Sequence, residues 1–450
     1  MKVAKFGGSS LANAEQIKKV CNIITSDSER EVIVVSAPGK RHKDDTKVTD
    51  LLIVCAEKYL ATGSAEEEVE AVLVRYREIA AELGLSKSIM DIIEEDIQQR
   101  LAQDTTNPGR FMDSLKAAGE DNCAKLVAEY LKSLGLEAHY IDPKEAGLLL
   151  SDEFGNAQVL PESYDNLYKL RNISGIKIFP GFFGYTKDGV VATFPRGGSD
   201  ITGSILAAAL KADLYENFTD VDSVFAANPN IVSNPKPISE LTYREMRELS
   251  YSGFSVLQEE TLIPVYRAGI PVCIKNTNNP DAPGTRIVHN RKVTNGPVSG
   301  IACDYGFCSI YVSKYLMNRE IGFGRRLLQI FEEEGLSYEH TPSGIDNISV
   351  ILRQNQMKKE DEDRIIERIK TELEVDDVSI GHDLALIIIV GEGMKNGIGI
   401  AAKATGAFAK AGISLEMINQ GSSEISIMFA VKSKDAEKAV RSLYETFFGN

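Results

Sequence analysis

The chain has 450 residues, of which 50 are Lys or Arg and 65 are Asp or Glu, so its formal net charge is −15. Hydrophobic residues make up 43% and charged residues 26%, as in ordinary globular proteins, and the length predicts about three domains. The acidic balance argues against nucleic acid or an anionic membrane as the main partner, because both would repel the chain.

The apolar runs and the cysteines indicate the cellular compartment in which the protein is expected. The longest clean apolar run, Leu384 to Val390, is far short of the ~20 residues that a membrane span needs, and the first residues lack the apolar stretch of a signal peptide. Six cysteines without a CxxC pair predict reduced thiols in a cytoplasmic protein. The five histidines show no zinc-ligand spacing, so we predict no metal site built from side chains.

The first segment follows the pattern strand, glycine turn, helix. Val3 to Phe6 is short and apolar, Gly7-Gly8-Ser9-Ser10 follows, and apolar residues then recur at helical spacing. The apolar run Val32 to Val35 predicts a strand that is buried on both faces. Strand, helix and strand in succession imply right-handed parallel crossovers, and the fold class expected is α/β.

The middle of the chain alternates between helical and extended patterns. Asp44 to Leu150 is predicted to be mostly helical, with Ala138 to Ile141 as the next strand. Further strands are expected at 176–179, 190–194 and 213–218, a helix at 201–211, and loops at 228–237 and 276–284. A domain edge is placed near residue 290.

The last third of the chain contains an internal repeat. Four matches share one offset of 77 residues: Gly335-Leu336-Ser337 with Gly412-Ile413-Ser414, Glu339 with Glu416, Gly344 with Gly421, and Ile348-Ser349-Val350 with Ile425-Ser426-Ile427. Each copy predicts strand, helix, strand, turn and strand. Two small α+β units side by side would form a natural ligand-sensing module.

The segment Lys5-Phe6-Gly7-Gly8-Ser9 lies where the first strand ends and a helix is expected. Glycines let the backbone approach a phosphate closely, and free amides at a helix start attract anions. Lys5 could place its ammonium on a phosphoryl group in transfer. The alternative is a tight turn with a solvated lysine, and the segment is not a Walker A loop, because GxxxxGK[ST] does not occur.

A second glycine turn, Arg196-Gly197-Gly198-Ser199-Asp200, precedes an alanine-rich helix. Arg196 offers a planar fork that suits a carboxylate, and Ser199 can donate to the same anion. Asp200 could alternatively be only a helix N-cap. Two glycine turns that each carry a cation suit a reaction between two anionic substrates, so the residues favour phosphate chemistry.

Three further segments are possible sites. Glu120, after Gly119, lies in a predicted helix, where a glutamate usually belongs to a solvated face. Thr219-Asp220 ends a strand ahead of a loop, a common place for a ligand in an open α/β sheet. Gly397 to Ala402 fits the GxGxxA pattern, but too few residues follow for a dinucleotide fold, which favours a close-packed turn or a small effector site.

Together these motifs resemble those of the aspartokinases, and the resemblance covers essentially the whole chain. The family's KFGGSS, VVSA, TxLL, GE, GF, RGGSD, TDV and GSSEISI segments correspond to residues 5–10, 34–37, 49–52, 119–120, 181–182, 196–200, 219–221 and 421–427. The resemblance implies an amino-acid-kinase domain at 1–290, an open, mainly parallel sheet sandwiched by helices. Two α+β ACT (ferredoxin-like) domains would follow, at 300–375 and 380–450.

The resemblance implies that ATP phosphorylates the β-carboxylate of L-aspartate to 4-phospho-L-aspartate, the first step towards lysine, threonine and methionine. Lys5 would stabilise the phosphoryl group in flight, and Asp200 would orient Lys5 or the phosphates. Glu120 would hold the substrate ammonium, and Arg196 and Ser199 a carboxylate. The full substrate-binding set implied is Ser36, Thr49, Glu120, Phe182, Arg196, Gly198 and Ser199.

The same resemblance implies an ATP site with Mg²⁺ largely on phosphate oxygens and waters. Its residues would be Lys5, Gly7, Gly8, Ser9, Thr219, Asp220, Phe225 and Asn230. The chain departs from the family pattern here, because Phe225, Asn228, Asn230 and Ser255 replace a tyrosine, an aspartate, an arginine and a lysine. Lys275 is expected to supply some of the lost positive charge.

The ACT pair implies feedback inhibition by lysine, threonine or both. Candidate effector residues are Tyr338, Glu339, Asp346, Met417 and Asn419, with ordinary strand ends and turns as the alternative. Exposed strand edges in the repeat suggest a homodimer or homotetramer formed through the ACT domains.

A monofunctional enzyme is expected, because no residues remain for the homoserine dehydrogenase of fused relatives. Two alternatives stay open. One is another amino-acid kinase that acts on a carboxylate or carbamate, against which the tandem ACT units argue. The other is a catalytically weak regulatory or sensor subunit, which the altered nucleotide loop favours.

Overall fold

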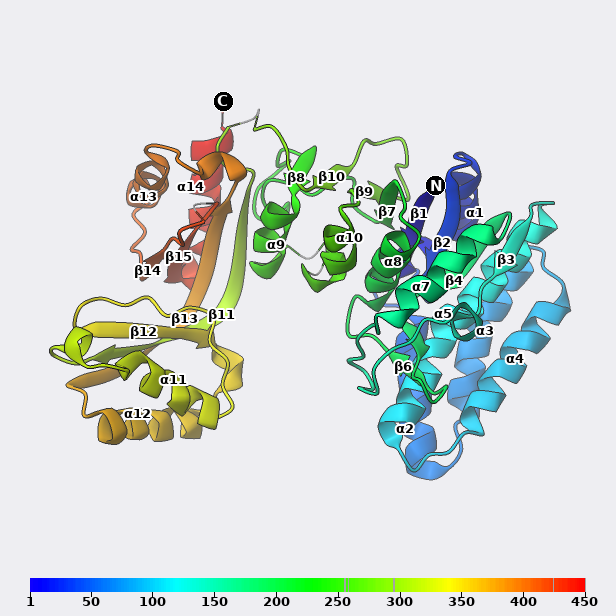
Figure 1. Ribbon diagram of the computed structural model, residues 1–450, viewed down its shortest axis with the longest axis horizontal. Coiled ribbons are helices and arrows are strands. Elements are labelled where there is room, and N and C mark those ends of the chain that lie inside the picture. Colours follow the sequence, from blue (N-terminus) through cyan, green and yellow to red (C-terminus); the bar gives the residue numbers. More distant parts are fainter. Residues whose placement is uncertain (255, 258, 294–295, 424, 450) are drawn as a thin grey trace. The chain divides into compact units, whose positions relative to one another are not determined.

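The computed structural model describes residues 1–254, 256–257, 259–293, 296–423 and 425–449. The chain divides into two compact units (Figure 1). The first comprises Met1–Val224, Pro237–Met246 and Val256–Arg291, and the second comprises Phe225–Lys236, Arg247–Ser255 and Lys292–Asn450. No helix in the described part of the chain is long and apolar enough to cross a membrane.

The first unit is built on an eight-stranded sheet with the order β3-β4-β2-β1-β7-β9-β10-β8. All neighbouring strands are parallel except β9 and β10, so the predicted open, mainly parallel sheet is confirmed. The strands are β1 (Lys2–Phe6), β2 (Arg30–Val35), β3 (Ala138–Tyr140), β4 (Ile176–Pro180), β7 (Leu214–Thr219), β8 (Glu240–Thr242), β9 (Val272–Asn276) and β10 (Thr285–Val288).

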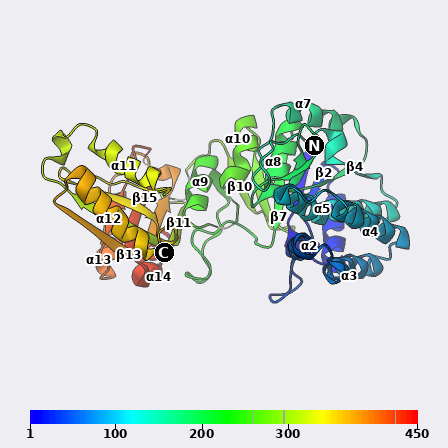
Figure 2. The ribbon, with the colours of Figure 1, turned by 90° about the horizontal axis from the view of Figure 1, so that it is seen from below.

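Helices cover both faces of this sheet (Figure 2). One face carries α1 (Ala14–Thr25), α2 (Val48–Thr62), α3 (Glu66–Glu82), α4 (Lys87–Leu101) and α5 (Pro108–Ser133). The other carries α8 (Gly198–Ala209), with α7 (Glu162–Tyr168) and α10 (Ile263–Ala268) packed against α8. The remaining short elements are η1 (Gly8–Leu11), α6 (Pro143–Ala146), η2 (Lys169–Asn172) and η3 (Glu259–Leu262), while α9 (Tyr243–Tyr251) has residues in both units.

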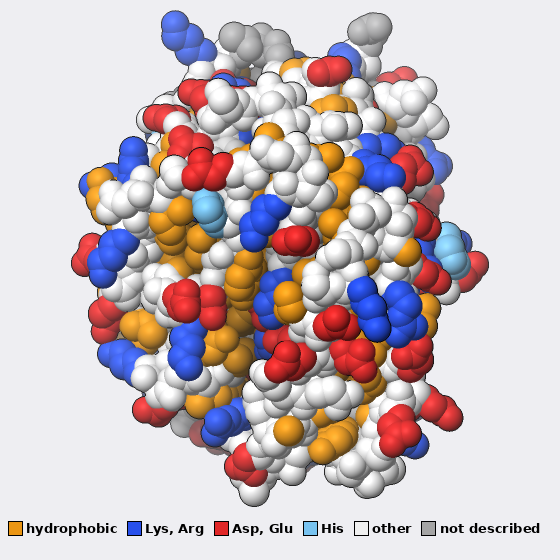
Figure 3. Space-filling view, turned by 90° about the vertical axis from the view of Figure 1, so that its right-hand side faces the viewer, with side chains coloured by type: hydrophobic (Ala, Val, Ile, Leu, Met, Phe, Trp, Pro, Cys, Tyr) orange, Lys and Arg blue, Asp and Glu red, His pale blue; other side chains and the backbone are white. Residues whose placement is uncertain are grey.

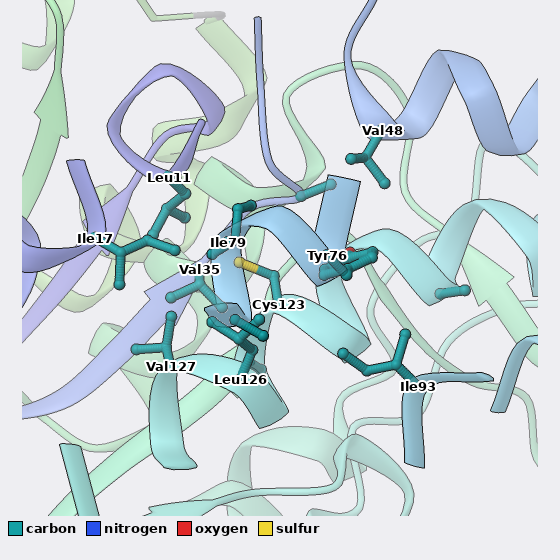
Figure 4. Close-up of a cluster of buried hydrophobic side chains, with 14 of the residues drawn as sticks. Leu11, Ile17, Val35, Val48, Tyr76, Ile79, Ile93, Cys123, Leu126 and Val127 are labelled. Carbon is teal, nitrogen blue, oxygen red and sulfur yellow. The ribbon is translucent and has the colours of Figure 1, made fainter. Parts of the chain in front are cut away.

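The largest core lies between the sheet and α1 to α5. Ile17 of α1, Val35 of β2, Tyr76 of α3 and Val127 of α5 meet in it, and each is almost fully buried (Figure 4). The phenol of Tyr76 donates to the backbone oxygen of Gly119 at 2.6 Å, which satisfies its one polar atom inside the core. This contact ties the middle of α5, where Glu120 lies, to α3.

Some predicted elements differ from the observed ones. The stretch 44–150, predicted to be mostly helical, contains α2 to α6, and its longest helix, α5, begins at Pro108 behind the N-cap Asn107. The glycine turn after β1 opens the 3-10 helix η1, and α1 starts only at Ala14. The strand expected at 190–194 is β6 (Val191–Thr193), which pairs with β5 (Phe183–Tyr185) outside the main sheet.

The second unit contains a five-stranded antiparallel sheet with the order β12-β11-β13-β15-β14. Its strands are β11 (Gly300–Ser313), β12 (Asn347–Arg353), β13 (Asp377–Val390), β14 (Met417–Asn419) and β15 (Ser426–Lys432). Its helices are α11 (Phe323–Glu333), α12 (Lys359–Leu373), α13 (Ile400–Lys410) and α14 (Ala436–Phe448), with short turns η4 (Met317–Arg319), η5 (Gln354–Gln356), η6 (Glu392–Met394) and η7 (Ser433–Asp435).

The internal repeat is visible in these elements. Helix α11 starts at residue 323 and α13 at residue 400, which is the offset of 77 seen in the sequence. Two separate hydrophobic cores result, one around α11 and α12 and one around α13 and α14. The predicted pair of α+β units is thereby confirmed.

The long strands β11 and β13 belong to both cores. Ile301 and Ile387 lie in the core of α13 and α14, whereas Ile310 and Val378 lie in the core of α11 and α12. Each of the two cores is therefore completed by one half of β11 and one half of β13. The domain limits 300–375 and 380–450 stay a prediction, and a boundary between the copies cuts through both strands.

Candidate active site

The site predicted from the sequence lies at one edge of the eight-stranded sheet. Strands β1, β2, β4 and β7 are parallel neighbours and end at Phe6, Val35, Pro180 and Thr219. The carboxyl ends of parallel strands share one edge, and in open α/β sheets ligands bind there. The segments that begin at Gly7, Ser36, Gly181 and Asp220 all start at this edge.

The two cationic glycine turns are joined by an ion pair. The ammonium of Lys5 lies 2.6 Å from Oδ1 of Asp200, although Lys5 is only 7% exposed. The side-chain amide of Asn217, on the neighbouring strand β7, donates to the same oxygen at 2.6 Å. The alternative interpretation of Asp200 as only a helix N-cap is wrong, because Gly197 is the N-cap of α8.

The first glycine turn allows very close backbone approach. A Cβ on Gly8 would lie 2.9 Å from the backbone oxygen of Ala37, and one on Gly39 would lie 2.5 Å from the carbonyl carbon of Gly8. The amide of Gly39 donates to the oxygen of Gly8 at 2.8 Å. A Cβ on Gly7 would be 3.5 Å from the Lys5 ammonium. A side chain at Gly8 or Gly39 would therefore clash with the neighbouring backbone, so both positions require glycine.

Glu120 is buried, so the expectation of a solvated helix face is wrong. It is 5% exposed, and its Oε2 has no hydrogen-bond partner among the described residues. Burial raises the pKa of its carboxyl to about 8. A hydrogen bond from the backbone amide of Ala37 acts in the opposite direction and lowers this pKa. Glu120 and Gly8 therefore both border Ala37. A buried carboxyl group with one oxygen left without a partner suits a cationic group of a ligand.

The second glycine turn packs against the segment after β4. A Cβ on Gly181 would lie 2.7 Å from Cβ of Ser199, and one on Gly198 would lie 2.6 Å from the ring of Phe182. Phe182 has a φ of 76°, a conformation that costs energy in a residue with a side chain. Its amide is held by Thr202 Oγ1 at 3.0 Å. The predicted residues Phe182, Gly198 and Ser199 are thus brought together.

The remaining predicted substrate residues, and Ser9 of the predicted ATP site, differ in exposure. Ser36 follows β2 and is half-buried, and its amide donates to the oxygen of Phe6 at 3.2 Å. Thr49 is half-buried in the first turn of α2. Ser9 and Arg196 are exposed. Arg196 therefore has a solvated guanidinium, which is available to a carboxylate.

The loops after β7 and β9 are tied together beside Thr219. The amide of Thr277 donates to the oxygen of Thr219 at 2.9 Å, and the side chain of Asn276 donates to Asp222 at 2.8 Å. Asp220 itself is exposed. This half of the predicted nucleotide site belongs to the first unit.

The rest of the predicted nucleotide loop belongs to the second unit. Phe225 is half-buried, and Asn228 and Asn230 are exposed in a turn in which Asn228 Oδ1 accepts from the amide of Asn230 at 2.9 Å. Ser255 lies outside the described residues. The nucleotide contacts of these residues stay a prediction.

Lys275 is half-buried on β9, opposite Phe218 of β7. We expect Lys275→Ala to raise the KM for ATP about 5- to 10-fold and to leave the KM for the acceptor unchanged, because one phosphate-facing charge is worth about 1 kcal/mol. Steady-state kinetics with varied ATP measure it. Arg286→Ala, which removes an exposed cation on β10, is the matched control. An unchanged KM for ATP in Lys275→Ala would remove this residue from the site.

Two of the predicted effector residues line different cavities. Tyr338 lines an open hollow of about 1000 Å³ beside α11, and Met417 lines a cavity of about 450 Å³ on the sheet of the second unit. Glu339 pairs with Arg353 at 3.5 Å, and Asp346 Oδ1 accepts from the amide of Leu316 at 2.9 Å. Asn419 contacts the ring of His340 at 3.4 Å. Their effector role stays a prediction.

Sequence reasoning missed several residues around the site. Asn217 is a buried amide on β7, between Glu216 and Phe218, and no local motif marks it. Gly39 carries no signal of its own beyond being a glycine shortly after a buried strand. Lys116, one helical turn before Glu120, was hidden in a helix with many charged residues.

Charge on the outer surface is mixed in sign. Figure 3 shows Lys and Arg side chains interspersed with Asp and Glu on one face. Within the described ranges, no three His, Cys, Asp or Glu residues are grouped so that they could hold a metal ion.

Comparison with known proteins places the chain in a family. The model of the amino acid kinase family matches residues 1–276, and an ACT domain model matches residues 387–447. Aspartokinase 3 of Bacillus subtilis is 62% identical over 448 residues, which cover 100% of this chain and 99% of the relative.

Two solved structures share the fold. A crystal structure of Clostridium acetobutylicum aspartate kinase has a TM-score of 0.87 and 39% identity, covering 99% of this chain and 100% of that one. Escherichia coli aspartokinase III in complex with aspartate and ADP has a TM-score of 0.78 and 24% identity, with full coverage of both. The chain belongs to the aspartokinases, within the amino acid kinase family.

Proposed function

We propose that this chain transfers the γ-phosphoryl group of ATP to the β-carboxylate of L-aspartate, giving ADP and 4-phospho-L-aspartate. The observation that carries the proposal is the Lys5–Asp200 ion pair, which joins the two glycine turns at one sheet edge. The related E. coli enzyme was solved with aspartate and ADP, which supports the same pair of ligands here.

In this reaction an oxygen of the β-carboxylate forms a bond to the γ-phosphorus. The bond from that phosphorus to the β–γ bridging oxygen breaks, and ADP leaves with the electron pair. Little covalent help is needed, so positioned charge supplies most of the catalysis. Lys5 neutralises charge on the moving phosphoryl group, and Asp200 and Asn217 hold Lys5 and each other in place.

The acceptor would be fixed on the other side of Lys5. The orphaned oxygen of Glu120 would take the substrate ammonium, and Arg196 with Ser199 would take the α-carboxylate. The β-carboxylate is then left facing the first glycine turn. This arrangement favours an amino acid with two carboxylates over a carbamate, which has no ammonium for Glu120.

We propose Mg²⁺ as the cofactor that enters with ATP. Mg²⁺ keeps several waters and binds substrate phosphates through one or two protein carboxylates at most. Asp220, exposed at the end of β7, is the carboxylate that fits this role. When bound, the cation would neutralise charge on the β- and γ-phosphates.

We propose that the second unit binds lysine, threonine or both as a regulatory effector. Its two α+β copies follow the ACT pattern, and the residues proposed for the effector are Tyr338, Glu339, Asp346, Met417 and Asn419. We also propose assembly into a homodimer or homotetramer through this unit, and a cytoplasmic location. Ligand binding would then favour one of two quaternary arrangements.

Trapping the acyl phosphate as a hydroxamate tests the activity. Purified protein with ATP, Mg²⁺, hydroxylamine and aspartate is expected to form hydroxamate, and omission of aspartate should abolish it. If no hydroxamate forms with any divalent cation, the result supports the alternative in which the chain is a regulatory subunit without kinase activity. Adding lysine or threonine to the same assay identifies the effector. If neither amino acid lowers the rate, the feedback proposal is contradicted.

A further inference from the structure

Lys116 lies on α5 one helical turn before Glu120, on the same face of the helix. Its ammonium is 2.8 Å from Oδ1 of Asp113 and 3.3 Å from Oγ1 of Thr193, and it lies 5.8 Å from the ring centroid of Phe182. It therefore connects α5, the strand β6 and the segment after β4.

Asp113 fixes this lysine firmly. Asp113 is 1% exposed, and its Oδ2 accepts from the amides of Gly155 at 2.7 Å and Thr193 at 2.8 Å. A buried carboxylate with both oxygens occupied has one stable orientation. The ammonium of Lys116 is consequently held at a defined place beside the ring of Phe182.

Phe182 connects Lys116 to the second glycine turn. Its ring fills the space beside Gly198, at the start of α8, while its backbone is held in a left-handed conformation. Such a conformation persists only where the surroundings enforce it. The contact with the Lys116 ammonium is one of these surroundings.

The contacts form a closed series around the sheet edge. Glu120 borders Ala37, Ala37 borders Gly8, and Lys5 beside Gly7 pairs with Asp200. Ser199 borders Gly181, and Phe182 then returns to α5 through Lys116. Lys116 is the member of this series that links the ammonium-binding element to the carboxylate-binding turn.

We infer that Lys116 is a positioning residue for the acceptor amino acid, because it holds Phe182 and the start of α8 at a fixed place relative to Glu120. The inference rests on the proposed function of the site. Three partners already surround the ammonium, so Lys116 is not itself a ligand of the substrate. It acts through Phe182, Ser199 and Glu120.

The charge of Lys116 also reaches Glu120. Groups that interact electrostatically with that carboxyl include Lys47 ahead of α2, Lys116 and Cys123 on α5, Tyr76 on α3, and the backbone amide of Ala37. Lys47, Lys116 and the Ala37 amide lower the pKa of Glu120, while burial raises it to about 8. Removing Lys116 leaves Glu120 harder to ionise, so ammonium binding would need a higher pH.

The test compares Lys116→Met with Lys125→Met. Lys125 is a matched control on the same helix, because its ammonium lies 3.0 Å from Asp121 and 5.7 Å from the ring centroid of Tyr140. We expect Lys116→Met to raise the KM for aspartate about 10-fold with kcat within about 3-fold. The acidic limb of kcat/KM for aspartate should also move to higher pH. Lys125→Met should show neither effect.

Lys116→Arg is the second variant, since it keeps the charge and can stack on Phe182. It is expected to restore most of the aspartate KM and the position of the acidic limb. An unchanged KM and pH profile in Lys116→Met, or equal effects in Lys125→Met, would overturn the inference. The wild-type assay separates the two proposals: a wild type that needs no aspartate refutes the proposed activity, whereas aspartate-dependent wild-type activity with an unchanged KM in Lys116→Met refutes only the role of Lys116.

Discussion

Lys5→Met is expected to lower kcat by about 10³-fold while the protein stays folded. The ammonium is 7% exposed and 2.6 Å from Asp200, so it acts where water screens charge poorly. One preorganised charge on a group in transfer is worth about 10²- to 10³-fold in rate, and here it serves the reacting phosphoryl group itself. Hydroxamate formation under saturating ATP and aspartate measures this loss.

Two further variants make the result specific. Asp200→Asn keeps the shape of the partner and removes its charge, so it should cost less than Lys5→Met, about 10- to 10²-fold in kcat. Lys177→Met is the control for loss of a buried lysine, because Lys177 is 1% exposed on β4 and pairs with Glu31 at 3.3 Å. It should lower the Tm and leave kcat per folded enzyme near the wild-type value. A kcat within tenfold of wild type in Lys5→Met would refute the catalytic role.

The parallel sheet was predictable because its strands carry an unambiguous signal. The run Val32 to Val35 is buried on both faces, and such a run in alternation with helices leaves few arrangements open. The repeat could also be predicted, because the offset of 77 residues is kept even where the individual residues differ between the copies. The helical character of 44–150 was predictable too, but the prediction did not divide this stretch into α2, α3, α4 and α5.

The exchange of strand halves in the second unit could not be predicted. Residues 300–313 and 377–390 each form one uninterrupted strand, although polar or glycine residues, Asp304 and Gly306 in β11 and Gly381 to Asp383 in β13, stand where each strand passes from one core to the other. Sequence spacing gives the copies but not which half-strand completes which copy. The irregular pairing near Tyr305 and Phe307 marks the transition only in the structure.

The site divides in the same way. Local motifs predict Lys5, Asp200 and the glycines. In these motifs the reactive side chain and the glycines that set the backbone conformation are neighbours in the sequence. Asn217 and Lys116 act through contacts between residues far apart in the chain, and no local spacing indicates them. The burial of Glu120 belongs to this class too, because its helix face has no strong period.

The second large effect is expected for Glu120→Gln, which should raise the KM for aspartate about 10²-fold and leave the KM for ATP near its original value. A charge-assisted hydrogen bond to the substrate ammonium becomes a neutral one, and a difference of about 2 to 3 kcal/mol follows. In the wild type, kcat/KM for aspartate should rise with pH through about 8, where Glu120 ionises. That limb should disappear in the variant.

The same substitution should stabilise the fold at high pH. The pKa of Glu120 is raised from 4.5 to about 8 by burial, so its contribution to stability is fully present below pH 4.5 and is lost as pH rises through 8. The amide introduced by Glu120→Gln does not ionise, so the Tm of this variant relative to wild type should increase between about pH 5 and pH 8.5. Glu129→Gln, on the same helix and half-buried, is the control and should show no such trend. A Tm difference that is flat across this pH range would mean that Glu120 stays ionised in the folded protein, because the ordering of its carboxylate by the Ala37 amide and Lys47 then outweighs the cost of burying it.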